Sequence, residues 1–464
     1  MTRHLLLPFL FIAMPLSAQT PSTTASMSPT PRPAFPQHES PGATREPVPD
    51  FEPEFDRDSP TVAAYRHREL NVLEFGAKAD GGSHPLSANF PTQEAIDARY
   101  GKGRYRSDDE TDFVAIMEAI RHAREAALEV RSKTARGLPT IYLPHGEYRI
   151  NRTLPIIDIN GFTLRGDGKQ QTRLTFTGRE EALFGIERSA TIAFSGMEVA
   201  SKLGAGATAF LVADTLAKHP GRPTYHIDWT AVQVREFDVG VKTTGWAMTD
   251  SLNFLNCRFN SCQTALWLDN HQSLGHHFTN CYFGFSTRHL ASLPPDGYPI
   301  VFRVNQGGNL TMTGGYIIIH DGVTLLLEPK NERLSFSPIN WSSGLYNFYG
   351  VRWEQVRKNH PVLFDAVDDG RFTARVHFDN CVVYQRAEAE GGAVGRLTAG
   401  MNVVLRNVGF NKEDAYIEEA AAKNDGKRRG LLILDNVSGL NYRAEGPPRH
   451  HVEIRGSAGP LFTP

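Results

Sequence analysis

The sequence has little cysteine, little net charge and no apolar run long enough for a membrane-spanning helix. Four of its 464 residues are cysteine, and a chain of this length can bury a large core without disulfide bonds. The formal net charge is −2, which gives no general attraction to nucleic acid. We therefore expect no nucleic acid partner, and any charge preference must be local. Oligomeric state is not fixed by these features.

The N-terminal apolar run is too short for a comfortable membrane span, and no later stretch reaches one. This run, Leu5 to Leu16, follows Arg3 and precedes Ser17-Ala18, which is typical of a signal peptide. We expect residues 1–18 to be removed, which makes the protein secreted or periplasmic without stable membrane insertion. The alternative is a short uncleaved anchor. Residues 19–68 are rich in Pro, Ser and Thr and are predicted to be a disordered leader.

Short apolar strands separated by turn residues recur from about residue 160 onward. The stretches FLNCRFNSC, FTNCYFGFS and FDNCVVYQR each have an aromatic residue two positions before an Asn and a Cys after it. Seven further stretches fit this pattern with Asn, Gly or Ala at the turn position. The ten turn positions, 24 to 36 residues apart, are Gly166, Gly196, Ala231, Asn256, Asn280, Gly314, Gly350, Asn380, Asn407 and Asn436.

A repeat of this length, without room for a helix between strands, predicts a solenoid of three short strands and three turns per unit. Asn suits the repeated turn because it tolerates left-handed backbone geometry and can bond to a neighbouring coil. Cys257, Cys281 and Cys381 follow equivalent turns and are expected to pack in the core as apolar residues. A disulfide between Cys257 and Cys281, a zinc site and a β-sandwich of unrelated strands are the weaker alternatives.

Four motifs follow one another over residues 70–168: NVLEFGAKADGG, SDDETDFVAIMEAIRHA, TIYLPHGEYRI and FTLRGDG. Their order resembles the N-terminal signature of the pectate-lyase-like superfamily, and the chain to about residue 456 resembles it by repeat pattern only. The resemblance implies an all-β, right-handed parallel β-helix of about ten coils over residues 69–460. Ala79 departs from the pattern, because the family usually has Gly there.

The acidic second motif is predicted to open a helix that covers the N-terminal end of the solenoid. Ser107 and Glu110 have the spacing of a capping box. The helix has one apolar face, formed by Phe113, Ile116, Met117, Ile120 and Ala123. An open solenoid end exposes strand edges, which need such a cover. The glycines of residues 75–82, with Asp80, Asp108 and Asp109, are therefore interpreted as structural.

In the family that the chain resembles, the strand after each Asn-Cys segment belongs to the sheet that forms the floor of the substrate groove. Alternation along these strands places a charged residue on the outer face of five successive coils. These candidate catalytic residues are Lys242, Asp269, Arg303, Glu328 and Asp365. The candidate substrate-binding residues are Trp267, His271, His276, His277 and Asn305, with Trp267 suited to stacking on a sugar ring.

Two chemistries fit these residue types, and a polysaccharide or oligosaccharide is the expected partner. In β-elimination of an anionic polysaccharide, Lys242 or Arg303 neutralises a uronate carboxylate or acts as the base, and Glu328 with Asp365 could hold Ca²⁺. In hydrolysis, two of Asp269, Glu328 and Asp365 act as the acid and base pair. A lyase is favoured because two cations lie on the face. A non-catalytic carbohydrate-binding β-helix is the third hypothesis.

Overall fold

The structure is a computed structural model, and it describes residues 69–129, 139–214, 223–245, 248–270, 272–293, 297–328, 343–355, 360, 362–366, 373–385, 392–398, 401–411, 415–419, 430–444 and 450–456. All of them belong to one compact unit, Asp56–Pro464. The signal peptide and leader predicted for residues 1–68 lie outside the described residues. No described helix is both long enough and apolar enough to cross a membrane.

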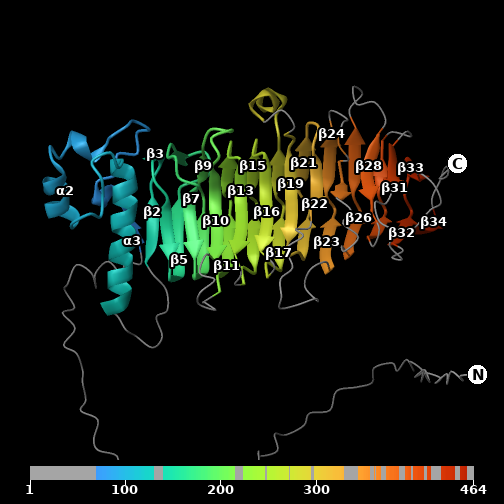
Figure 1. Cartoon of the computed structure of the whole chain (residues 1–464), viewed down its shortest axis with the longest axis horizontal. Coiled ribbons are helices and arrows are strands. Elements are labelled where there is room, and N and C mark those ends of the chain that lie inside the picture. The colour runs from blue at the N-terminus through green and yellow to red at the C-terminus, as the bar shows by residue number, and fades with distance from the viewer. Residues whose placement is uncertain are drawn as a thin grey trace, which may run out of the picture. The chain divides into compact units, whose positions relative to one another are not determined.

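The described strands form a right-handed parallel β-helix with three long sheets, as the sequence predicts. Each coil contributes one strand to sheet 1, then one to sheet 2, then one to sheet 3, and every strand pairs in parallel with its equivalents in the neighbouring coils. The coils follow one another in sequence order from α3 to β34 (Figure 1). Equivalent residues of successive coils are therefore brought side by side.

Sheet 1 has 13 strands in the described part of the chain. In spatial order they are β1 (Glu69–Asn71), β2 (Thr140–Leu143), β5 (Asn160–Gly166), β8 (Ala190–Ser195), β11 (Tyr225–Thr230), β14 (Leu252–Leu255), β17 (His276–Thr279), β20 (Leu310–Thr313), β23 (Ser343–Tyr349), β26 (Thr373–Asp379), β29 (Asn402–Arg406), β32 (Gly430–Asp435) and β34 (His450–Arg455).

Sheet 2 has ten described strands, most of them shorter. They are β3 (Gly146–Ile150), β6 (Thr172–Phe176), β9 (Glu198–Ala200), β12 (Gln233–Arg235), β15 (Arg258–Asn260), β18 (Tyr282–Gly284), β21 (Tyr316–Ile319), β24 (Arg352–Gln355), β27 (Val382–Gln385) and β30 (Gly409–Phe410).

Sheet 3 has 11 described strands and carries the predicted site. They are β4 (Leu154–Ile157), β7 (Ala182–Glu187), β10 (Thr208–Asp214), β13 (Val239–Gly245), β16 (Thr264–Asn270), β19 (Ile300–Gln306), β22 (Val323–Leu327), β25 (Phe364–Ala366), β28 (Ala393–Leu397), β31 (Ala415–Glu419) and β33 (Leu440–Ala444).

The predicted turn positions are equivalent in successive coils and lie between sheet 1 and sheet 2. Nine of the ten adopt left-handed backbone geometry, with φ between 51° and 63°; Gly166 does not. The asparagines also bond along the coil: Asn280 Nδ2 donates to Asn256 Oδ1 at 2.8 Å, and Asn436 Nδ2 donates to Asn407 Oδ1 at 2.8 Å. The repeat thus reflects one backbone requirement that nine of the ten turns meet.

The core inside the coils is built from stacked aromatic and aliphatic side chains. Phe254 stacks between Trp229 and Phe278, with ring centroids 4.5 and 4.3 Å apart. All four cysteines are free and buried, so the predicted core packing of Cys257 and Cys281 is confirmed and the disulfide alternative is wrong. Each thiol points to a carbonyl of the preceding coil, as Cys257 does to Trp229 O at 3.2 Å.

The N-terminal end of the coil is covered by α3 (Thr111–Glu129), as predicted (Figure 1). Its apolar face is buried, with Ile116 fully inaccessible. Around it lie α2 (Gln93–Tyr100) and the 3₁₀ turns η1 (Val72–Phe75) and η2 (Leu86–Ala88). The predicted capping box at Ser107 is wrong, because Asp109 closes its own turn by accepting from Arg106 N at 2.8 Å, and α3 begins only at Thr111.

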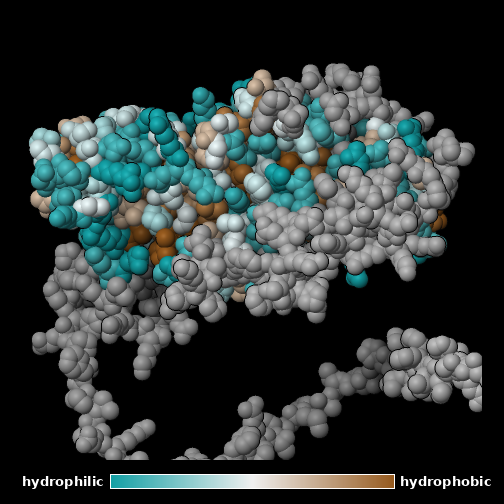
Figure 2. Space-filling model, viewed as in Figure 1, coloured by the Kyte–Doolittle hydropathy of each residue, from teal (hydrophilic) through white to brown (hydrophobic). Residues whose placement is uncertain are grey.

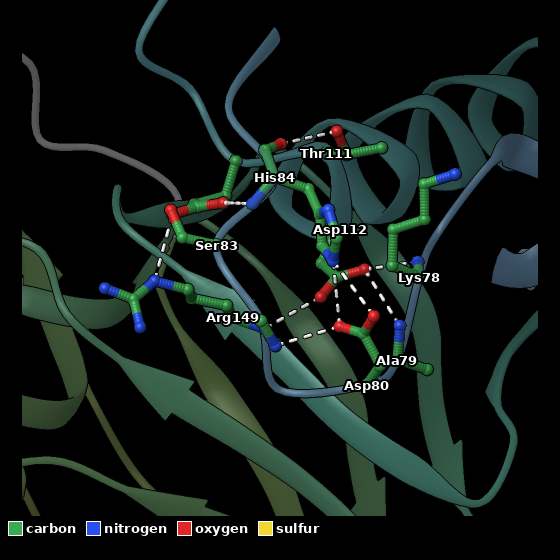
Figure 3. A network of polar contacts seen from close by, with 10 residues as sticks. Lys78, Ala79, Asp80, Ser83, His84, Thr111, Asp112 and Arg149 are labelled. Carbon is green, nitrogen blue, oxygen red and sulfur yellow. Dashed lines mark hydrogen bonds and ion pairs between the residues drawn. The ribbon is translucent and has the colours of Figure 1, made fainter. Parts of the chain in front are cut away.

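Asp112 at the start of α3 explains the glycine-rich segment of residues 75–82 (Figure 3). Its carboxylate accepts backbone N–H groups from Lys78 at 2.6 Å, Ala79 at 3.2 Å and Arg149 at 2.9 Å. Ala79, the residue that replaces the family's usual glycine, has φ 57°, in the region that favours glycine. The segment therefore joins the covering helix to β3 and is structural, as the sequence analysis concludes.

Candidate functional site

One row of outward side chains runs along sheet 3 and contains most of the predicted charges. The strand register pairs Lys242 with Trp267 and Trp267 with Arg303. It continues through Leu326 to Asp365. The row arises because β-strand side chains alternate in direction and every coil repeats the same phase. We call these five residues, with the adjoining Arg396, the groove row.

Trp267 lies between two cations from the strands on either side of β16. The ammonium of Lys242 is 4.9 Å from the indole centroid, and the guanidinium carbon of Arg303 is 4.5 Å from it. Such cation–π contacts fix both charges on a rigid support. The faces of the indole are taken by these cations, so the predicted stacking of Trp267 on a sugar ring does not fit this arrangement.

Arg303 is also held by Glu328, which follows β22. Its Nε donates to Glu328 Oε2 at 2.7 Å, and both side chains are about one-third to one-quarter exposed, at 31% and 26%. Asn305 donates from Nδ2 to the Glu328 carbonyl at 2.7 Å and accepts a hydrogen bond from Trp267 Nε1. Arg303 is thus oriented from two sides while its side chain remains partly exposed.

Asp365 has an arginine partner that the sequence analysis missed. Arg396 NH1 donates to both Asp365 oxygens, at 3.1 and 2.9 Å, and its Nε donates to Glu418 at 2.6 Å. Each of the two carboxylates, Glu328 and Asp365, is therefore paired with an arginine. Burial raises the pKa of Asp365 above its ordinary value, although Arg396 acts in the opposite direction.

The two carboxylates predicted to hold Ca²⁺ do not fit that ion. Calcium takes six to eight oxygen ligands, whereas Glu328 and Asp365 each already bind a guanidinium, whose charge repels a cation. Across the described part of the chain, no three His, Cys, Asp or Glu side chains gather in a way that could hold a metal ion.

Tyr298 and His360 stand beside the groove row and were not among the predicted residues. Their rings stack with centroids 3.9 Å apart, and Tyr298 packs on the outward apolar cluster that includes Leu326. Burial raises the pKa of Tyr298, and the charges of Asp365 and Glu328 raise it further. The sequence signal was weak, because Tyr298 lies in a loop before β19 and His360 in a separate loop before β25.

Asp269 lies on β16 two residues beyond Trp267, so it is displaced from the groove row. The pairing of β16 with β19 shifts at this point, and Asp269 aligns with Gln306, which leaves Asn305 as the extra residue of a bulge. Asp269 therefore lies near the end of β16, at the point where the pairing with β19 becomes irregular.

The histidines predicted to bind substrate do not gather at the groove row. His271 lies outside the described residues. His276 is fully buried, with Ser273 Oγ 3.1 Å from its Nε2, and this burial removes it from the surface. His277 is exposed but belongs to β17 in sheet 1, not to sheet 3. The sequence prediction places these histidines in a loop beside Asp269, whereas His276 and His277 begin β17, where the His276 side chain faces the core.

Comparisons with known proteins identify the fold and no family. No family model and no curated protein matches the sequence. The structure is similar to the A-module of mannuronan C-5 epimerase AlgE6 of Azotobacter vinelandii, with 16% identity, a TM-score of 0.50 and coverage of 84% of this chain and 100% of that chain. It is also similar to the tailspike protein of E. coli bacteriophage HK620, with 11% identity, a TM-score of 0.49 and coverage of 85% and 67%. At these identities the similarity concerns the fold alone.

Proposed function

We propose that this protein is an exported enzyme that cleaves an anionic polysaccharide by β-elimination in the groove of sheet 3. The observation that carries the proposal is the fixed position of Arg303, between Trp267 and Glu328 and close to Tyr298. A cation held rigidly on an outward face is suited to a uronate carboxylate, which it binds and neutralises. The mannuronan epimerase module that shares the fold is named for a reaction on such a polymer, which agrees with this choice.

The residues around Arg303 can supply the separate catalytic groups that elimination requires. Lys242 and Arg303 neutralise the uronate carboxylate and make the proton on the adjacent carbon more acidic. His360 is the candidate base that takes this proton. Tyr298 keeps its hydroxyl proton because burial raises its pKa, so it can donate that proton to the departing glycosidic oxygen. The carbon–oxygen bond breaks, and the products are an unsaturated uronide and a new reducing end.

Hydrolysis is the second candidate, and the raised pKa of Asp365 favours it. A carboxyl group whose pKa is raised is better suited to protonate a leaving group, and Glu328 on the adjacent coil would then act as the base. The bidentate contact with Arg396 opposes this role, because an arginine partner stabilises the ionised form of Asp365.

A panel of polyuronates and neutral polysaccharides distinguishes these activities. We expect polyuronates to show rising absorbance of the unsaturated uronide together with new reducing ends. Reducing ends without that absorbance would support the hydrolase, and neither signal on any polymer that binds would support a non-catalytic binding protein.

Substitutions in and away from the site test the assignment. Tyr298→Phe removes only the hydroxyl, and Arg303→Ala removes the neutralising cation; each should lower turnover by about a hundredfold or more. Arg303→Ala should lower the free energy of unfolding by only about 1 kcal/mol, since the ion pair is partly exposed. Arg443→Ala is the matched control, because Arg443 also covers an aromatic ring, that of Tyr416 at 3.8 Å, farther along sheet 3. Full activity of both site variants would show that the groove is wrongly assigned.

A further inference from the structure

A second polar site lies at the turns that lead from sheet 2 to sheet 3. A cavity of about 350 Å³ opens there over β12, β15, β18 and β21. Its lining includes Glu236 and Ser261 from successive turns and Arg288 from η3 (Thr287–Ser292). None of these residues belongs to the groove row.

Ser261, His289 and Glu236 form a connected chain in this cavity. Ser261 Oγ lies 2.9 Å from His289 Nδ1, and His289 Nε2 lies 3.3 Å from Glu236 Oε1. The negative charge of Glu236 beside Nε2 favours the tautomer of His289 that carries its proton on that nitrogen. Nδ1 is then left as the acceptor for the hydroxyl proton of Ser261. This is the order of nucleophile, base and orienting acid that serine hydrolases use.

The fold holds Ser261, His289 and Glu236 in place. Ser261 and Glu236 have positive φ, at 54° and 58°, at equivalent turn positions of neighbouring coils. Arg235 Nε donates to Glu236 Oε1 at 2.9 Å and fixes the carboxylate. In the next coil, the chain leaves the equivalent turn at Phe285 and forms η3, which brings His289 back over Ser261. The histidine is mostly buried, with its side chain 14% exposed.

We propose that this cavity is the site of a serine esterase that acts on a short acyl ester of a polyhydroxy alcohol. Ser261 Oγ attacks the ester carbonyl and transfers its proton to His289 Nδ1. The bond to the alcohol oxygen breaks, His289 returns the proton to that oxygen, and water then releases the acid from Ser261 by the same steps. Phe285 and Ile318 offer apolar surface for the acyl group, and Arg288 is the lining cation that can face the carbonyl oxygen. This activity does not depend on the groove of sheet 3.

Covalent labelling and ester hydrolysis test the proposal on the full chain. A fluorophosphonate probe should label the wild-type protein, with mass spectrometry locating the adduct on Ser261, and 4-nitrophenyl acetate should be hydrolysed. Ser261→Gly removes the hydroxyl but tolerates the positive φ, and it should abolish both signals. His289→Gln should lower the rate of labelling and of hydrolysis by about a hundredfold or more.

Ser251→Gly is the matched control, because Ser251 also has a positive φ, at 59°, but lies in the turn that leads from sheet 3 to sheet 1. It should label and hydrolyse at the wild-type rate, and the melting temperatures of all variants show whether they fold. Absence of an adduct on Ser261, or labelling that His289→Gln leaves unchanged, overturns the proposal.

Discussion

At the scale of single residues, the turn asparagines combine two functions that few side chains can combine. Asn407 has φ 51°, and its amide donates to Asn380 at 3.2 Å while its oxygen accepts from Asn436 at 2.8 Å. The backbone geometry excludes most residues with a Cβ, and the side-chain bonds exclude glycine as an equal replacement. The asparagines are exposed, so their contribution comes from geometry and not from burial.

Replacing Asn407 separates these two functions. Asn407→Ala loses the side-chain hydrogen bonds to Asn380 and Asn436 and leaves an alanine with positive φ. Together these changes should lower the free energy of unfolding by about 2–3 kcal/mol. Asn407→Gly keeps the backbone geometry at low strain and should cost only about 1 kcal/mol. Denaturant unfolding of both variants checks the order. Equal losses would mean that the backbone conformation contributes nothing measurable.

His276 makes stability depend on pH. Burial lowers its pKa to about 4 from an ordinary 6.5, so between these values the unfolded chain binds a proton that the folded chain does not. The free energy of unfolding is therefore not reduced by this group above pH 6.5. It falls as the pH drops, by about 2.5 kcal/mol at pH 4.5. His276→Leu should remove this loss, and Leu310 already occupies the equivalent position in the next coil. Parallel pH profiles of unfolding free energy for wild type and variant would contradict the prediction.

At the scale of elements, α3 is joined to the coil by more than its apolar face. Asp112 is nearly inaccessible and gathers backbone donors from the segment after η1 and from β3. The surface around α2 and α3 in Figure 2 is largely hydrophilic, as expected for the outer side of a covering layer. The acidic motif thus buries the carboxylates of Asp109, Glu110 and Asp112 and leaves that of Asp108 exposed.

Two aspartates of this motif should therefore respond differently to truncation. Asp112→Ala leaves three backbone N–H groups without their carboxylate acceptor and should cost about 3 kcal/mol or more. Asp108→Ala is the control, since this side chain is exposed and only its backbone carbonyl accepts, from Asn151 Nδ2 at 2.8 Å. It should change stability by less than about 0.5 kcal/mol. Thermal melts of both variants decide, and equal effects would remove Asp112 from this role.

At the scale of the whole molecule, the sequence predicted the coil better than the site. The repeat pattern depends only on neighbouring residues. Spacing therefore predicted nine left-handed turns, and alternation predicted that Lys242, Trp267 and Arg303 face outward. Arg396, in β28, was missed because its partner Asp365 is distant in sequence, and His360 was missed because its loop follows no repeat. His276 is predicted in a loop beside Asp269 but begins β17 with its side chain in the core, because no local pattern marks where that loop ends.

The stacking of coils also predicts how far the destabilising effect of one substitution extends along the β-helix. Each strand pairs only with its equivalents in adjacent coils, as β14 does with β11 and β17, so stability is approximately a sum of neighbouring terms. Phe254→Leu, in the stack between Trp229 and Phe278, should cost on the order of 1 kcal/mol. Hydrogen exchange should accelerate most in β11, β14 and β17 and little in β32.

Phe378→Leu is the matched control for that experiment, because Phe378 is also buried and stacks on Phe348 with centroids 4.9 Å apart. Its effect should be largest in β26 and in the two strands that pair with it, β23 and β29, and small in β11. Two distinct patterns mean that energetic coupling decays along the coil, as nearest-neighbour contacts require. The same uniform acceleration in both variants would mean that the coils unfold as one cooperative unit, and a substitution in a distant coil would then weaken the groove as much as one beneath it.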